Sequence, residues 1–346
     1  MLLNPKKYKC LDRNNFKKNS FQIVPIRYND RFDIMQWRNE QIFHLRQDKE
    51  LTVDDQDAYF ENIISTLFDQ EQPKQILFSL LKDNKCIGYG GLVHINWIDK
   101  NAEISFLMNT EEEKINFEIN WSIFLELIEQ VAFGELNFFK LYTYAFNIRP
   151  NLYTVLESSN YCKEAILQKQ CLFGDKFIDV YIHSKMNQDF LFYRKTEPKD
   201  VKVYFDWIND PEVRSLSFNS NNINYKDHVI WFNSKCYDKD CVMLIFYDYN
   251  KEYVGQIRFE KTNKKEALIS FSIDKNHRNK KYGSKILMLG TKYFSGLNPS
   301  FIIKGYVKVD NFRSKKVFEN AGFILENKVE FENNKSFLYT NKKNEN

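Results

Sequence analysis

The chain repeats one pattern of apolar and polar segments. In each half, alternating and helically spaced apolar residues predict the order strand, helix, helix, several strands, helix, strand, helix and final strands. The likeness is clearest in one strand, where AEISFLMN from Ala102 matches ALISFSID from Ala267. A repeat of this length indicates duplicated domains rather than a solenoid. We therefore predict two mixed α/β domains, 1–187 and 188–346, each a mixed sheet flanked by helices.

Composition narrows the class of protein. The apolar share of 43% is ample for a core, and the net charge of +4 is too balanced to indicate nucleic-acid binding. The six cysteines form no Cys-x-x-Cys pair, so we expect buried thiols and no metal site. No apolar run has the length of a membrane span. We therefore expect a cytoplasmic protein without membrane or nucleic-acid partners.

A basic segment, HRNKKYGSKILMLG at 277–290, lies between a predicted strand and a predicted amphipathic helix. Free backbone N–H groups and the helix dipole favour an anion at such a point. Gly283 allows the main chain to approach a ligand closely. The alternative is a helix entry whose cations only face water. Cations at a helix N-terminus are unfavourable for the helix itself, which favours a bound phosphate.

The segment ISFSIDKNHRNKKYGSKIL resembles the acetyl-CoA signature of the GCN5-related N-acetyltransferases (GNAT), and VDNFRSKKVFENAGF resembles the second signature of that family. The resemblance implies that acetyl-CoA is the cosubstrate, with its pantetheine arm along the strand Ile269 to Ile273 and its pyrophosphate on the loop from Arg278 to Ser284. The implied cofactor residues are Phe271, Ser272, Ile273, Arg278, Asn279, Lys280, Lys281, Tyr282, Gly283, Ser284, Asn311 and Ser314.

Two positions depart from the family pattern. Lys281 replaces the first glycine of the loop, and Phe318 stands where the family often has a tyrosine acid. That leaves water or Tyr306 to protonate the leaving thiolate. For the base that deprotonates the amine, the candidates are Glu266, which begins the cofactor strand, and His228. An exposed carboxylate and a packed histidine are the structural alternatives.

The acceptor is suggested by WINDPEVRSLSFNSNNINYKDHVIWF, which resembles sugar-nucleotide acetyltransferases of bacterial nonulosonic acid pathways. The resemblance implies a UDP-linked amino sugar as substrate. Arg214, Asn219, His228 and Trp231 would supply hydrogen-bond donors and a stacking face. Alternatively, Trp231 is a core residue and Arg214 pairs with a nearby carboxylate. The resemblance of the opening WxND to ribosomal-protein alanine acetyltransferases leaves acetylation of a protein N-terminus open.

The first half carries NTEEEKINFEIN in place of the basic loop. Three consecutive glutamates, Glu111 to Glu113, would repel a pyrophosphate, and neither loop glycine is present. We therefore predict that this half does not bind CoA in the usual way. It could be a substrate-side module, a homodimer surface or a second active site, with Glu103 placed much as a family base would be. A duplicated binding or scaffolding module without catalysis is the remaining alternative.

Overall fold

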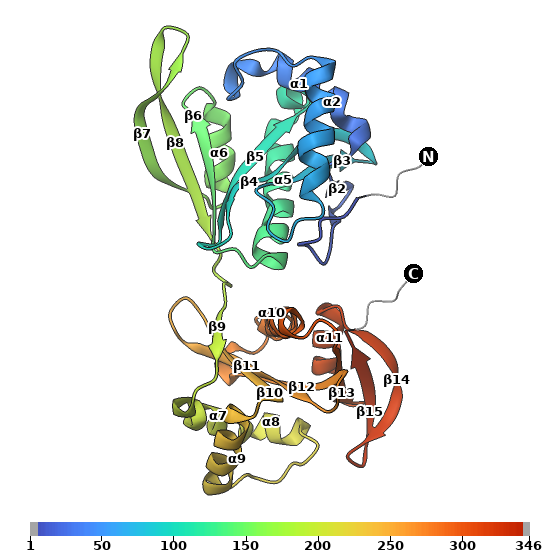
Figure 1. Ribbon diagram of the computed structural model, residues 1–346. Helices are drawn as coiled ribbons and strands as arrows, with labels where there is room; N and C mark the ends of the chain where they lie inside the picture. The colour runs from blue at the N-terminus through green and yellow to red at the C-terminus, as the bar shows by residue number, and fades with distance from the viewer. Residues whose placement is uncertain (1–5, 342–346) are drawn as a thin grey trace. The chain divides into compact units, whose positions relative to one another are not determined.

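The computed structural model describes residues 6–341 and divides the chain into two compact units, 1–190 and 191–346. Each unit has one mixed sheet with helices on its faces (Figure 1). This confirms the predicted fold class. No helix among residues 6–341 is long and apolar enough to cross a membrane.

The sheet of the first unit has the order β1-β2-β3-β4-β5-β6-β8-β7, in which only β5 and β6 pair in parallel. Its strands are β1 (Phe16–Lys18), β2 (Phe21–Pro25), β3 (Ile76–Lys82), β4 (Lys85–Asn96), β5 (Asn101–Met108), β6 (Lys140–Phe146), β7 (Cys162–Phe173) and β8 (Lys176–Met186). Its α-helices are α1 (Arg31–Glu40), α2 (Val53–Tyr59), α3 (Ser65–Leu67), α4 (Thr110–Ile115), α5 (Phe117–Glu129) and α6 (Pro150–Ser158). Short 3-10 or π segments lie at Tyr28–Asp30, Ile42–His44, Phe60–Ile64 and Gln130–Glu135.

The sheet of the second unit has the order β14-β15-β13-β12-β11-β10-β9, in which only β12 and β13 pair in parallel. Its strands are β9 (Phe192–Lys195), β10 (Cys241–Tyr247), β11 (Tyr253–Lys261), β12 (Glu266–Ile273), β13 (Ile302–Lys308), β14 (Ile324–Phe331) and β15 (Asn334–Thr340). Its helices are α7 (Val201–Ile208), α8 (Pro211–Leu216), α9 (Tyr225–Tyr237), α10 (Tyr282–Leu297) and α11 (Phe312–Asn320), with 3-10 turns at Pro198–Asp200 and Lys275–His277.

Three helices, not the predicted two, follow the first strand of the second unit. The break after α7 comes from Asp210, whose side chain accepts hydrogen bonds from the N–H groups of Glu212 and Val213 and so begins α8. Pro211 at the first helical position has no N–H to satisfy. The sequence NDPEV therefore ends one helix and begins another.

The helices of the second unit pack on both faces of its sheet. On one face, Gly290 of α10 lies over Ile257 and Phe259 of β11, and the Phe259 and Phe294 rings stack 4.6 Å apart. On the other face, a smaller cluster joins Tyr204 and Trp207 of α7 and Phe232 of α9 to Met243 and Ile245 of β10. The side chains of β11 and β12 therefore alternate between a face under α10 and α11 and an opposite face toward α7 and α9.

Candidate active site

A cavity of about 830 Å³ opens in the second unit where β12 and β13 separate. The two strands pair only from Glu266–Ile302 to Leu268–Lys304, and beyond that point they diverge. The edge of β12 at 269–273 is therefore left without a strand partner on its β13 side, and backbone N–H and C=O groups there are available to a bound ligand. The cavity is lined by β12, the following loop, α11 and β13 on one side and by α8 on the other.

The loop between β12 and α10 forms one end of the cavity. Asn279 and Lys281 both have left-handed backbones, with φ of 65° and 62°, and α10 begins directly afterwards at Tyr282. Left-handed residues before a helix turn successive N–H groups toward one point, which makes an anion-binding concavity at the positive end of the dipole. Lys281 thus adopts the conformation that glycine favours in this loop, while its side chain adds a cation.

Gly283, the second residue of α10, is packed closely against α11. A Cβ at this position would lie 3.1 Å from the Val317 side chain, which is tighter than ordinary contact. Gly283 also lines the cavity. A larger residue would therefore push α10 and α11 apart. It would also narrow the anion-binding concavity at 278–284, the anion seat.

Two carboxylates at the start of α8, from the capping residue Asp210 and from Glu212, contact the arginines beside this loop. Arg278 donates to Asp210 Oδ1 at 2.7 Å and to Glu212 Oε2 at 2.6 Å. The other oxygen of Glu212 pairs with Arg313 of α11. Although burial opposes it, the Arg278 hydrogen bond lowers the pKa of Asp210. Arg278 is thus engaged by protein carboxylates, which the loop sequence alone did not indicate.

The structure brings most of the predicted cofactor residues to one cavity. Asn311 caps α11, because its Oδ1 accepts a hydrogen bond from the Ser314 N–H at 3.0 Å, and it also lines the cavity. Lys280 is exposed and is not part of the lining. The predicted residues that do line the cavity are Phe271, Ser272, Ile273, Arg278, Asn279, Lys281, Tyr282, Gly283, Ser284, Asn311 and Ser314.

The far end of the cavity combines an aromatic wall with charged groups. Tyr306 of β13 stacks on Phe331 of β14 with ring centroids 3.9 Å apart, and Phe218 meets Phe331 edge-on at 5.0 Å. Arg258 and Glu260 of β11 also line the cavity. Sequence reasoning missed this group except for Tyr306, although alternation along β11 places 258 and 260 on one face.

Glu260 is one of three glutamates that line the cavity, and it lies on the strand next to β12. Its backbone pairs with Leu268 of β12, and its Oε1 accepts from Lys235 Nζ of α9 at 2.5 Å. In the first unit the corresponding backbone pair is Val93 of β4 and Glu103 of β5. There the carboxylate lies on β5, the counterpart of β12, instead of on the counterpart of β11. Both units therefore carry one carboxylate at this level of the sheet, on neighbouring strands.

The two predicted catalytic residues lie elsewhere. Glu266 pairs with Lys304 at 2.7 Å and accepts from Asn263 at 3.1 Å, and the Lys304 contact lowers the pKa of Glu266. His228 is buried among the rings of Phe205, Trp231 and Phe232, and burial lowers its pKa. Neither side chain lines the cavity. The structure gives Glu266 an ion pair at the start of β12 and gives His228 a packing role among aromatic rings.

The predicted substrate residues also remain outside the cavity lining. The Arg214 guanidinium donates to the Asn221 carbonyl and to Ser217 Oγ, both at 2.9 Å, so it holds the loop after α8. Asn219 is exposed and caps a turn by accepting from the Asn221 N–H. The Trp231 ring lies 5.1 Å from the Arg258 guanidinium. Because Arg258 lines the cavity, Trp231 lies behind a lining residue.

The equivalent loop of the first unit has a different chemistry. Asn109 accepts from the N–H groups of Glu111 and Glu112 and so starts α4. Glu113 pairs with Arg149 at the start of α6, and burial raises the pKa of Glu113 against the effect of Arg149. Glu118 is the second residue of α5, where Gly283 is the second residue of α10. An acidic, side-chain-filled helix entry thus replaces the anion seat.

Glu103 in the first unit is held by an arginine and a histidine. It is buried, and it contacts Arg46 and also His94 Nδ1 at 2.9 Å. The Arg46 guanidinium lies 4.2 Å from the centre of the Tyr144 ring. The Arg46 guanidinium therefore neutralises a carboxylate at the strand position that the sequence suggested for a base.

A sheet with one parallel pair that splays apart, an anion-binding loop after the splayed strand and a cavity between the strands define an acyl-transfer fold. GNAT acetyltransferase domain models match residues 23–182 and residues 191–324. The chain belongs to the GNAT acetyltransferases, with two domains in tandem. This confirms the predicted family and the predicted class of acyltransferase.

Several solved structures are similar to part of the chain at low identity. Spermidine N-acetyltransferase from Vibrio cholerae in complex with CoA and spermine is 19% identical over 43% of this chain and 92% of that chain, with a TM-score of 0.40. Aminoglycoside acetyltransferase AAC(6')-Ib in complex with coenzyme A is 14% identical over 43% of this chain and 93% of that chain, with a TM-score of 0.39. Comparison with curated proteins finds no significant match.

Proposed function

We propose that the second unit transfers acetyl from acetyl-CoA to the amino group of a nucleotide-linked amino sugar. The observation that carries the proposal is the single cavity, which joins the anion-binding loop at 278–284 to an aromatic wall and a carboxylate at its far end. The loop would take the pyrophosphate and the open edge of β12 the pantetheine arm. The acetyl group would then lie between the two strands, facing Glu260.

Glu260 is the base that we propose in place of Glu266 and His228. The amine nitrogen attacks the thioester carbon, the C–N bond forms as the C–S bond breaks, and the amine proton passes to the Glu260 carboxylate directly or through water. A backbone N–H of β12 near Phe271 would stabilise the carbonyl oxygen as it gains charge. The leaving thiolate takes a proton from water or from Tyr306, which lines the cavity.

The acceptor end favours a neutral or anionic substrate over a polycation. In the cavity lining as a whole, Arg and Lys residues outnumber carboxylates: the lining includes Glu212, Glu260 and Glu332 against Arg258, Arg278, Lys281, Lys308, Arg313 and Lys316. Lys308 also donates to the Ser217 carbonyl at 2.6 Å. A polyamine or aminoglycoside, the acceptors of the solved proteins above, would require an excess of carboxylates. A uracil or sugar ring suits the stacked Tyr306 and Phe331.

The test is a comparison of acceptors with acetyl-CoA and the full chain, measuring release of the CoA thiol. A UDP-linked amino sugar is expected to give the highest kcat/KM, ahead of peptides with N-terminal alanine and of spermidine. Glu260→Gln should lower kcat by roughly 10²–10⁴-fold, because a general base contributes that much. The matched control is Glu330→Gln, which changes an exposed glutamate of β14. Preference for the peptide or spermidine would refute the acceptor class, and an unchanged kcat would refute the base.

A further inference from the structure

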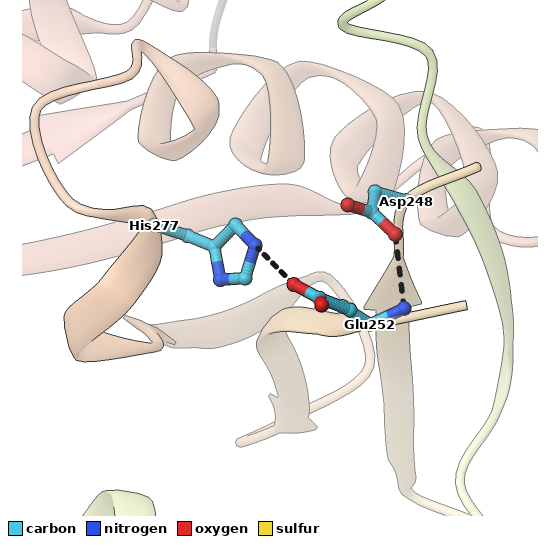
Figure 2. A group of neighbouring side chains, drawn as sticks. All are labelled: Asp248, Glu252 and His277. Atoms are coloured by element: carbon cyan, nitrogen blue, oxygen red, sulfur yellow. Dashed lines mark hydrogen bonds and ion pairs between the residues drawn. The ribbon is translucent and has the colours of Figure 1, made fainter. Parts of the chain in front are cut away.

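Three potential metal ligands meet beside the cofactor loop in the second unit. Asp248 and Glu252 belong to the turn between β10 and β11, and His277 belongs to the 3-10 turn after β12. One ligand atom from each residue lies within 4.8 Å of the other two (Figure 2). No residue of the acetyl-transfer chemistry described above is shared with this group, although His277 also borders the cofactor cavity.

The β10–β11 turn fixes its two carboxylates on the same side. Asp248 Oδ1 accepts a hydrogen bond from the Glu252 N–H at 2.9 Å, and the Asp248 N–H donates to the Glu252 carbonyl at 3.0 Å. Lys251 closes the turn in a left-handed conformation, with φ of 65°. The Glu252 side chain is 68% exposed and can rotate, whereas Asp248 is half-buried and tied to the turn.

His277 is the buried member, and it is aimed at the carboxylates. It is only 6% exposed, and its Nδ1 lies 3.4 Å from Asp274 Oδ1. Asp274 is itself fixed, because its Oδ2 accepts from Trp207 Nε1 at 2.9 Å. His277 Nε2 then faces Glu252 Oε2 at 3.7 Å, longer than a hydrogen bond. A carboxylate behind one ring nitrogen and an open second nitrogen is the arrangement that orients a metal-bound imidazole.

We propose that Asp248, Glu252 and His277 bind one divalent transition-metal ion of the zinc type. Imidazole nitrogen with two carboxylates suits zinc and its neighbours better than magnesium or calcium, which prefer oxygen ligands throughout. Ligands about 2.0–2.2 Å from a tetrahedral zinc lie roughly 3.4 Å apart, so rotation of the Glu252 side chain closes the site. Water fills the fourth position. The site departs from the expectation of no metal, which rested on cysteine spacing.

The position of the site gives the ion a structural role. His277 immediately precedes the loop at 278–284, and its ring centroid lies 6.0 Å from that of Tyr282 at the start of α10. A bound ion would tie this loop to the β10–β11 turn. We expect this tie to raise the affinity of the loop for acetyl-CoA. That gain rests on the proposed acetyl transfer, whereas metal binding itself does not. The two ideas can therefore fail separately.

The experiment titrates the full chain, freed of metal by a chelator, with Zn²⁺ by calorimetry. The wild-type chain should bind one Zn²⁺, and the double variant Asp248→Asn/Glu252→Gln should weaken binding by about 100-fold or more. Glu330→Gln is the control and should bind as the wild type does. His277 is kept, because it lines the cofactor cavity. Absence of Zn²⁺ binding, or equal affinity in the double variant, would overturn the proposal.

Co²⁺ substitution identifies the ligands, because the chain also has six cysteines, whose thiolates are alternative zinc ligands. A nitrogen–oxygen site gives a visible cobalt spectrum without a thiolate-to-cobalt charge-transfer band, and the double variant should lose that spectrum. A thiolate band would place the metal on cysteines and refute the site. Acetyl-CoA binding is then measured with and without Zn²⁺. A several-fold gain in wild type that disappears in the double variant supports the structural role, and equal affinity refutes that role.

Discussion

Glu212 competes with the phosphates of acetyl-CoA for the arginines beside the anion seat. Its carboxylate contacts both Arg278 and Arg313, and the three side chains are 40%, 19% and 66% exposed respectively. Glu212→Gln removes the negative charge while keeping the side-chain length. Asp210 stays in place to hold Arg278. We expect the variant to bind acetyl-CoA more tightly than the wild type does.

The magnitude follows from Coulomb's law. A pyrophosphate with two negative charges about 8 Å from the Glu212 carboxylate is repelled by roughly 1–4 kcal/mol, from bulk water to an effective dielectric of ~20. Glu212 is partly exposed, so the lower part of this range applies. A gain of about 1.4 kcal/mol corresponds to a tenfold lower Kd. The difference should shrink as salt is added, because exposed charges are screened.

Calorimetry with acetyl-CoA at low and high salt measures this effect. Glu330→Gln removes one exposed negative charge from β14 and is the matched control for net charge. A Kd for Glu212→Gln that equals the wild-type value would contradict the competition. A weaker affinity would show that Glu212 instead holds the two arginines in the geometry that binds the phosphates.

Two further predictions concern stability. Gly305→Ala should destabilise the second unit by about 1–3 kcal/mol in urea unfolding, because the added Cβ would lie 2.3 Å from the buried Phe318 ring. The control Gly296→Ala, where a Cβ would meet no packing neighbour within 4 Å, should be neutral or slightly stabilising. Equal effects of the two substitutions would contradict the packing argument. Burial and the Arg149 guanidinium lower the pKa of His44 in the folded chain to about 3. As pH falls, the unfolded chain therefore binds this proton before the folded chain does. The stability that His44 confers is lost between about pH 6.5 and pH 3. His44→Gln should therefore flatten the fall in first-unit stability between about pH 7 and pH 5, and an unchanged slope would refute the shift.

Local patterns sufficed for the fold and for the cofactor end of the site. The strand at 267–273, the left-handed loop and the amphipathic helix are neighbours in the chain, so their spacing placed Gly283 and Ser284 in one cavity. Lys281 shows that the loop conformation survives without the expected glycine, with φ of 62°. The opposite charge of the 109–116 segment likewise followed from the sequence alone.

Long-range contacts account for what the sequence did not reveal. Arg278 donates hydrogen bonds to Asp210 and Glu212, which precede it by more than sixty residues. The sequence around the loop therefore does not predict these partners. Glu260 reaches the cavity because β11 pairs with β12 in one register, which short patterns do not specify. His228 had suitable chemistry for a base, but the packing of α7 and α9 surrounds it with aromatic rings.

The stoichiometry of acetyl-CoA binding tests the central claim, that the second unit alone holds the cofactor. Calorimetry on the full chain should give one acetyl-CoA per chain, with binding weakened more than tenfold by Gly283→Val, whose added atoms meet Val317 and the anion seat. Glu118→Val changes the matching second residue of α5 and should leave binding intact. Two acetyl-CoA molecules per chain, or loss of binding in Glu118→Val with Gly283→Val unaffected, would contradict the account.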